Sequence, residues 1–399
     1  MRNAFAQQIT SLAGADPRVV VLAGDIGNRL FDKLKAQSPD RFFNCGVAEA
    51  NMIGMAAGMA MNGLRPFCYT ITPFLTYRCL EQIRVDVCYH HVPVVLVGTG
   101  SGLSYASLGA THHSCEEMGM LRLLPGLAVL APADEWEVRA AIKAALKYPH
   151  PVYMRIGKKG EPAIHKTEPE FVIGQALPIR EGTNVCLLSA GTMLQAAMQT
   201  AEELEKHAIS AKVVSFPCLK PLDEALLSAV FAKFKYVATM EEHSVLGGLG
   251  GAVAEWLSGV RLPGRLLRFG TPDEFLHDTC DQAEARAHFG LTPAAMSERI
   301  RGEMINELSG VSGGARLKAQ QMAKATIDTF DFDIFYRIPR ISGTISRPTG
   351  YAHEDYRLLH NGRVTAMLLR AGRWWWRRLW RLGWCRGGRA AGDDDGHDF

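Results

Sequence analysis

The chain has 399 residues, which is enough for two or three domains that each bury a hydrophobic core. A hydrophobic content of 47% and a charged content of 21% are typical of globular proteins, and a formal net charge of +3 is too small to predict a nucleic-acid partner. The nine cysteines include no Cys-x-x-Cys pair, which argues against a zinc site and a disulfide framework. The N-terminus lacks a signal-peptide core, and no uncharged run of about 20 residues could span a bilayer. We therefore expect a protein of the reducing cytoplasm with no membrane span.

Apolar runs alternate with helical patterns in the first half of the chain. Strands are predicted at residues 18–25, 93–98 and 128–132, and helices at residues 48–62, 74–90, 115–123 and 134–147. This alternation predicts a mostly parallel sheet with helices on both faces. Ligands bind such sheets at the carboxyl ends of the strands, where we expect the site.

A second α/β unit is predicted from about residue 180 onwards. It has strands at residues 184–192, 211–216 and 235–242 and a helix at residues 193–207. The glycines of residues 247–251 have neither the GxGxxG nor the Walker spacing, so tight helix–sheet packing is favoured over a phosphate loop. The predicted fold class is therefore α/β, with two doubly wound, mostly parallel-sheet domains in tandem. We place these domains at residues 1–160 and 179–300, with a linker at 161–178.

The periodic pattern decays at residues 301–399, where we expect an irregular C-terminal tail. Five of the seven tryptophans lie among arginines at residues 373–386. Such a basic aromatic segment could lie on a membrane surface, but an extraneous tail without a selected role is the simpler interpretation.

One carboxylate, Glu49, stands near the start of residues 46–63, which are otherwise mainly small and apolar. A buried carboxylate is costly unless something pairs with it. A first-turn glutamate that complements the helix dipole, worth about 0.3–1 kcal/mol, would also explain the position. The choice between the two explanations depends on the motifs that accompany Glu49.

Six spaced segments of the first half resemble a known family in their order. They are Gly24-Asp25, Gly46-Val47-Ala48-Glu49, residues 66–74, residues 109–114, residues 131–134 and Tyr153-Met154-Arg155. Together they resemble the pyrimidine-binding domain of transketolases and 1-deoxyxylulose-5-phosphate synthases, which depend on thiamine diphosphate. Residues 220–223 and 241–250 are similar to the C-terminal domain of the same family. The resemblance covers about residues 1–300.

The resemblance implies a role for Glu49 and for the residues around the cofactor. In the family, a carboxyl side chain that is hydrogen-bonded to N1′ of the cofactor pyrimidine promotes the tautomer that deprotonates the thiazolium ring. Glu49 matches the residue that carries this side chain. Phe74 matches the aromatic residue that stacks on the pyrimidine, although a core phenylalanine is the alternative, and Tyr77 is expected nearby. Asp25 matches an acidic residue close to the cofactor, or is a helix cap. Ile71 stands where typical transketolases carry a further aromatic residue.

The resemblance also implies substrate contacts. His112 matches the histidine that contacts the donor sugar, its neighbour His113 is a weaker candidate, and Arg155 matches an arginine that binds the sugar phosphate. Two positions depart from the family. Leu108 replaces an aspartate that reads the donor's stereochemistry, and Gly100 aligns with a second phosphate-contacting histidine. The sugar specificity is therefore open.

The family's metal site is missing from this sequence. The family holds the diphosphate through Mg²⁺ bound by Gly-Asp-Gly and a later asparagine in a separate N-terminal domain, and residues 25–28 and 393–396 do not supply that pattern. We therefore predict no metal ligands here. The chain looks like the C-terminal half of a split transketolase, which needs an N-terminal subunit and forms an α2β2 hetero-oligomer.

Three functions compete at this point. The first is transfer of a two-carbon ketol unit between sugars or sugar phosphates, with Glu49 activating thiamine diphosphate. The second is decarboxylative condensation of pyruvate with an aldehyde, as in the synthases. The third is a non-catalytic partner subunit, against which the retention of Glu49, Phe74 and His112 argues.

Overall fold

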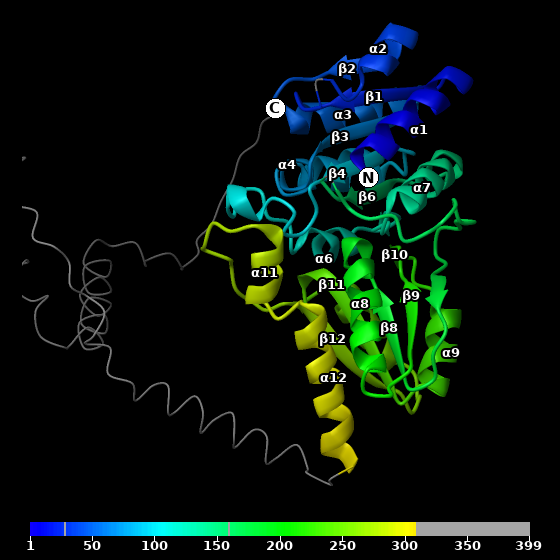
Figure 1. Cartoon of the computed structure of the whole chain (residues 1–399). Coiled ribbons are helices and arrows are strands. Elements are labelled where there is room, and N and C mark those ends of the chain that lie inside the picture. Colours follow the sequence, from blue (N-terminus) through cyan, green and yellow to red (C-terminus); the bar gives the residue numbers. More distant parts are fainter. Residues whose placement is uncertain (28, 159, 309–399) are drawn as a thin grey trace, which may run out of the picture. The chain divides into compact units, whose positions relative to one another are not determined.

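The computed structural model describes residues 1–27, 29–158 and 160–308 (Figure 1). The tail predicted at residues 301–399 therefore lies outside the described residues from residue 309 onwards. No helix in the described part of the chain combines the length and the hydropathy needed to cross a bilayer.

The first sheet has seven strands in the order β10-β5-β6-β4-β3-β1-β2, of which all but β10 come from the first half of the chain. Its strands are β1 (Val19–Ala23), β2 (Phe42–Asn44), β3 (Arg65–Ile71), β4 (Val95–Thr99), β5 (Ala128–Leu130), β6 (Val152–Ile156) and β10 (Cys218–Lys220). Its helices are α1 (Arg2–Ala15), α2 (Asp32–Gln37), α3 (Glu49–Met61), α4 (Thr72–Thr76), α5 (Leu80–Gln82), the π-helical segment η2 (Ile83–Tyr89), α6 (Glu117–Arg122) and α7 (Glu135–Lys147). Every pairing is parallel except that of β10 with β5. The carboxyl ends of the parallel strands therefore meet at one edge of the sheet.

Apolar side chains cover both faces of this sheet. Along β1, Val19 and Val21 pack with Phe5 of α1, whereas Val20 and Leu22 pack with α3 on the opposite face. Strands buried on both faces read as continuous apolar runs, which explains the run in the sequence of β1.

The second half forms a five-stranded sheet with the order β12-β11-β8-β9-β7. Its strands are β7 (Leu177–Arg180), β8 (Val185–Ser189), β9 (Ala211–Ser215), β11 (Tyr236–Ser244) and β12 (Arg265–Thr271), and its helices are α8 (Leu194–Glu205), α9 (Glu224–Lys233), α10 (Leu249–Ser258), α11 (Gln282–His288) and α12 (Pro293–Leu308). Only β7 pairs antiparallel. The predicted fold class, two mostly parallel α/β domains in tandem, is confirmed.

Three details differ from the pattern expected from the sequence. The helix expected at residues 74–90 is divided into α4, α5 and η2. Helix α12 continues through residue 300 and ends at Leu308. The segment expected as a linker is held at several points, because Asp134 accepts hydrogen bonds of 2.8 Å from the backbone N–H groups of Ile164 and His165.

The two domains share structure. Strand β10 leaves the second half to pair with β5 of the first sheet, and Ser244 N–H donates to the Cys115 carbonyl at 2.6 Å. One hydrophobic cluster extends from Met52 and Leu96 in the first domain to Leu188 and Phe231 in the second. The domains are therefore joined by a continuous core and by main-chain hydrogen bonds.

Candidate active site

Glu49 lies at the carboxyl edge of the first sheet as the first residue of α3, and it is only 4% exposed. Gly24, which follows β1, allows close approach here, because a Cβ on it would lie 2.9 Å from Thr70 Oγ1 and 3.4 Å from Glu49 Cγ. No side chain caps the start of α3 at Ala48. The glutamate is therefore a buried carboxylate at an otherwise uncapped helix N-terminus, where the helix dipole favours negative charge.

Arg78 pairs with Glu49 and stacks on Phe74 at the same time. Its Nη1 lies 3.1 Å from Glu49 Oε2, and its guanidinium carbon lies 4.0 Å from the centroid of the Phe74 ring. The Phe74 ring is partly exposed, so it is not a fully buried core side chain. The site thus holds one planar cation between an aromatic face and a carboxylate.

His112 also contacts the Phe74 ring. The two ring centroids are 5.1 Å apart in an edge-on arrangement, and His112 Nδ1 lies 2.9 Å from the hydroxyl of Thr111. Burial, and then the nearby charges of His113 and Arg78, lower the pKa of His112. A neutral imidazole at pH 7 offers both a donor and an acceptor nitrogen.

The other predicted cofactor neighbours have partners of their own or precede a helix of the site. Tyr77 donates a 2.5 Å hydrogen bond to Glu116, and burial followed by the charge of Glu117 raises the pKa of its phenol. Ile71 precedes α4 and is partly exposed. Asp25 has a positive φ of 52°, an uncommon conformation for a residue other than glycine, and its carboxylate accepts from Asn44 at 2.9 Å.

The structure does not bring Arg155 to a surface where it could hold a phosphate. Its side chain is buried, with Nη1 3.0 Å from Glu117 Oε1 and Nη2 donating to the Glu242 carbonyl at 3.1 Å. The phosphate contact expected from the sequence therefore stays a prediction, and in this structure the guanidinium joins residues of the two domains. His113 is also buried, with Nε2 3.3 Å from the Ala106 carbonyl.

The two departures from the family pattern have different structural settings. Leu108 is 52% exposed. Gly100 has a φ of +77°, and a Cβ there would fall 1.8 Å from a ring carbon of Tyr105. Tyr105 itself lies 5.9 Å from the His112 ring, with Lys158 Nζ 4.7 Å from its centroid. Tyr105 therefore fills the space next to the glycine where the family carries a histidine.

Arg78 is the site residue that sequence reasoning missed. The helix expected at residues 74–90 would already have placed Arg78 on one face with Phe74, four residues earlier, and that spacing is the signal that could have found it. In the structure Arg78 lies instead in the turn between α4 and α5.

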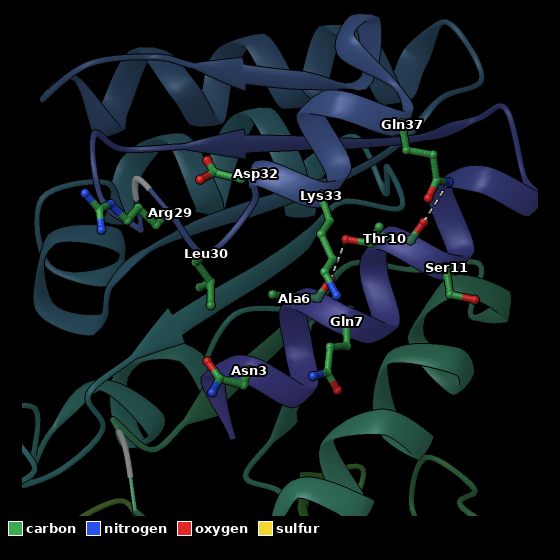
Figure 2. Close-up of a pocket in the computed structure, with 10 residues that line it drawn as sticks. All are labelled: Asn3, Ala6, Gln7, Thr10, Ser11, Arg29, Leu30, Asp32, Lys33 and Gln37. Carbon is green, nitrogen blue, oxygen red and sulfur yellow. Dashed lines mark hydrogen bonds between the residues drawn. The ribbon is translucent and has the colours of Figure 1, made fainter.

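A surface hollow of about 660 Å³ lies elsewhere, between α1 and the segment of residues 29–37. Figure 2 shows the side chains of α1 and α2 facing one another across it, with the Gln37 amide donating to the Thr10 carbonyl at 3.4 Å. None of the predicted site residues lines this hollow. The candidate site is therefore defined by contacts among side chains, not by this hollow.

Two family models match the chain in the order of its two domains. Residues 1–161 match the transketolase pyrimidine-binding domain, and residues 174–296 match the transketolase C-terminal domain. A tandem of these domains, with a buried glutamate at the carboxyl edge of the first sheet, defines a protein of the thiamine-diphosphate-dependent class.

Similar proteins include named transketolase subunits and a split-gene transketolase. One subunit of the apulose-4-phosphate transketolase of Phocaeicola vulgatus is 33% identical over 73% of this chain and 93% of its own length. A subunit of the 6-deoxy-6-sulfo-D-fructose transketolase of Clostridium sp. is 36% identical, covering 69% of this chain and 85% of its own length. A solved split-gene transketolase, described as an inactive β4 tetramer, is 34% identical, covers 75% of this chain and 96% of its own, and has a TM-score of 0.68. The chain belongs to the transketolase family, and the resemblance expected from the sequence is confirmed.

Proposed function

We propose that this chain is the C-terminal subunit of a split, thiamine-diphosphate-dependent transketolase that transfers a two-carbon ketol unit between sugars. The observation that carries the proposal is the contact of one planar nitrogen cation with both Glu49 and Phe74. The same two side chains match the family's pyrimidine-binding residues.

The geometry fits an aminopyrimidine. A ring stacked on Phe74 would present its edge nitrogens to Glu49 as the Arg78 guanidinium does now. When bound, thiamine diphosphate supplies a nucleophilic thiazolium carbon that accepts the ketol unit. The buried Glu49 carboxyl holds a proton against the pyrimidine nitrogen, Phe74 orients the ring, and the neutral His112 donates or accepts a hydrogen bond at a sugar oxygen.

A partner chain completes the enzyme in this proposal. Two similar proteins are named as subunits of transketolases, and the sequence lacks the family's diphosphate motif. We therefore assign the diphosphate and Mg²⁺ ligands to an N-terminal subunit and expect an α2β2 assembly. Free thiols at eight described cysteines support a reducing cytoplasmic location.

The substrates we propose are sugars or sugar phosphates of a kind different from the usual pentose-phosphate pair. Leu108 offers no polar group to read a donor hydroxyl, and Tyr105 fills the space beside Gly100. Lys158, whose Nζ lies 4.7 Å from the centroid of the Tyr105 ring, could attract an anionic end of the sugar.

Reconstitution with the N-terminal subunit tests the proposal. The pair, supplied with thiamine diphosphate and Mg²⁺, should transfer ketol units from a ketose without releasing carbon dioxide, and this chain alone should not. Carbon dioxide released from pyruvate would favour the synthase reaction instead. A pair that binds no thiamine diphosphate would overturn the proposal in favour of a non-catalytic partner subunit.

A variant of Glu49 adds a residue-level check. Glu49→Gln removes the shared proton, so we expect turnover of the reconstituted pair to fall by at least about 100-fold while the fold survives. Glu81→Gln, which changes an exposed glutamate in α5, is the matched control. Full activity in Glu49→Gln would exclude Glu49 from the chemistry.

A further inference from the structure

We infer that the Arg78 guanidinium occupies the pyrimidine position in the cofactor-free chain and must leave it before thiamine diphosphate binds. This inference rests on the proposed function. It makes Arg78 a competitor of the cofactor for the contacts with Glu49 and Phe74.

One side chain makes both contacts that the pyrimidine needs. The guanidinium covers the Phe74 face at 4.0 Å and donates to Glu49 at 3.1 Å. Only one planar group can stack on one face of Phe74, and the guanidinium and the aminopyrimidine would both bring an edge nitrogen to Glu49. The two groups therefore exclude one another.

The Glu49 oxygen that Arg78 occupies is not open to the pyrimidine. An arginine has five N–H donors and no acceptor, and Arg78 Nη1 lies 3.1 Å from Glu49 Oε2. A pyrimidine nitrogen that forms a hydrogen bond with the same oxygen takes the position of that N–H group. Arg78 must therefore release Oε2 before the pyrimidine contacts it.

The exposures of the two partners make the exchange easy. The Glu49 side chain is 4% exposed and would be costly to leave unpaired, whereas the Arg78 side chain is 47% exposed and can turn into water. Arg78 therefore keeps the buried carboxylate paired until the cofactor replaces it.

Binding measurements on the full chain test the exchange. The first probe is 4-amino-5-hydroxymethyl-2-methylpyrimidine, which carries the ring without the diphosphate and is titrated into this chain alone by ligand-observed NMR. The second is thiamine diphosphate with Mg²⁺, titrated by calorimetry into the complex with the N-terminal subunit. The variants are Arg78→Ala, Arg78→Lys and the control Arg84→Ala, which changes an exposed arginine of η2.

We expect Arg78→Ala to bind both probes about 5- to 20-fold more tightly than the unmodified chain, because the competing ion pair and stacking are lost. Arg78→Lys should fall between the two, since it retains charge but not a planar face, and Arg84→Ala should stay within about twofold of the unmodified chain. The melting temperature of cofactor-free Arg78→Ala should be lower, and its rise on cofactor binding larger.

Two different results would contradict the exchange, and only the second would also contradict the proposed function. Equal or weaker binding by Arg78→Ala, with binding by the unmodified chain intact, would overturn the exchange alone and make Arg78 a residue that stays with the cofactor. No binding of thiamine diphosphate by any complex, with all chains folded by circular dichroism, would overturn the proposed function and the exchange together.

Discussion

At the scale of single residues, two arginines pair with buried carboxylates in different ways. Arg78 is 47% exposed and its partner Glu49 is 4% exposed, so that pair can open. Arg155 and Glu117 are 5% and 0% exposed, so opening that pair would leave two charges out of water. The first arrangement suits a binding position, and the second suits a permanent joint between domains.

Arg155→Met should therefore act on stability. It leaves Glu117 buried without its cation, and removing one partner of a buried pair costs about 3–5 kcal/mol. The measurement is the free energy of unfolding in urea, and the Arg155→Met/Glu117→Met double variant should recover most of the loss. An Arg155→Met variant of unchanged stability that had lost affinity for phosphorylated sugars would return Arg155 to the substrate ligands.

The sequence was sufficient to bring together some of the candidate site residues, but it did not predict their charged partners. Glu49, Phe74 and His112 follow short motifs whose spacing survives in the linear sequence, and the structure joins all three through Arg78 and the Phe74 ring. The partner of Arg155 could not be predicted, because the Glu117 and Glu242 contacts connect distant parts of the chain.

At the scale of elements, the segment after β4 contains two glycines with a positive φ, Gly100 and Gly109. Gly100 and Gly109 share a φ of +77°, but a Cβ would strike Tyr105 only at Gly100 and meets nothing within 4 Å at Gly109. We expect Gly109→Ala to cost about 1 kcal/mol from backbone strain, and Gly100→Ala to cost about 1–3 kcal/mol more from overpacking. Urea unfolding of the two variants checks this, and equal losses would show that Tyr105 moves aside freely.

The start of α10 gives a pH dependence. Glu241 accepts hydrogen bonds from the N–H groups of Leu249 (2.6 Å) and Gly250 (2.7 Å), and burial raises its pKa from 4.5 to about 7. Between these values the folded chain retains a proton that the unfolded chain has released. This contribution to stability is therefore complete below about pH 4.5 and is lost as the pH rises through 7.

Glu241→Gln should remove this dependence. Between pH 5 and 8, the unfolding free energy of the unmodified chain should decline by up to about 3 kcal/mol more than that of the variant. Urea unfolding at several pH values measures both slopes. Glu137→Gln in α7 is a second case of the same effect and should also flatten the slope, since burial raises the pKa of Glu137 to about 7. Parallel slopes for Glu241→Gln and the unmodified chain would mean that Glu241 is ionised throughout.

Element prediction succeeded where burial on two faces leaves a continuous apolar run, as in β1 and β8. It failed for the long helix at residues 74–90, because an apolar helical period does not record where the backbone changes from α4 to α5 and then to η2. Strand β10 has three residues and pairs with a strand about 90 residues earlier, so no local pattern could place it.

At the scale of the whole molecule, the described domains should unfold together. One hydrophobic cluster includes side chains of both domains, and β10 belongs by pairing to the first sheet and by sequence to the second half. Hydrogen exchange followed by mass spectrometry across a urea series should give one opening free energy for peptides of β4 and β8. Loss of protection in β8 at a lower urea concentration than in β4 would show that the domains unfold separately.

The position of β10 also affects how this chain folds during translation. The other six strands of the first sheet emerge before Cys218–Lys220, and until then the outer edge of β5 has no partner. An unpaired strand edge is a template for association with another nascent chain. Synonymous codons that slow translation between β6 and β10 should therefore lower the yield of folded protein, although they leave the amino-acid sequence and the active site unchanged.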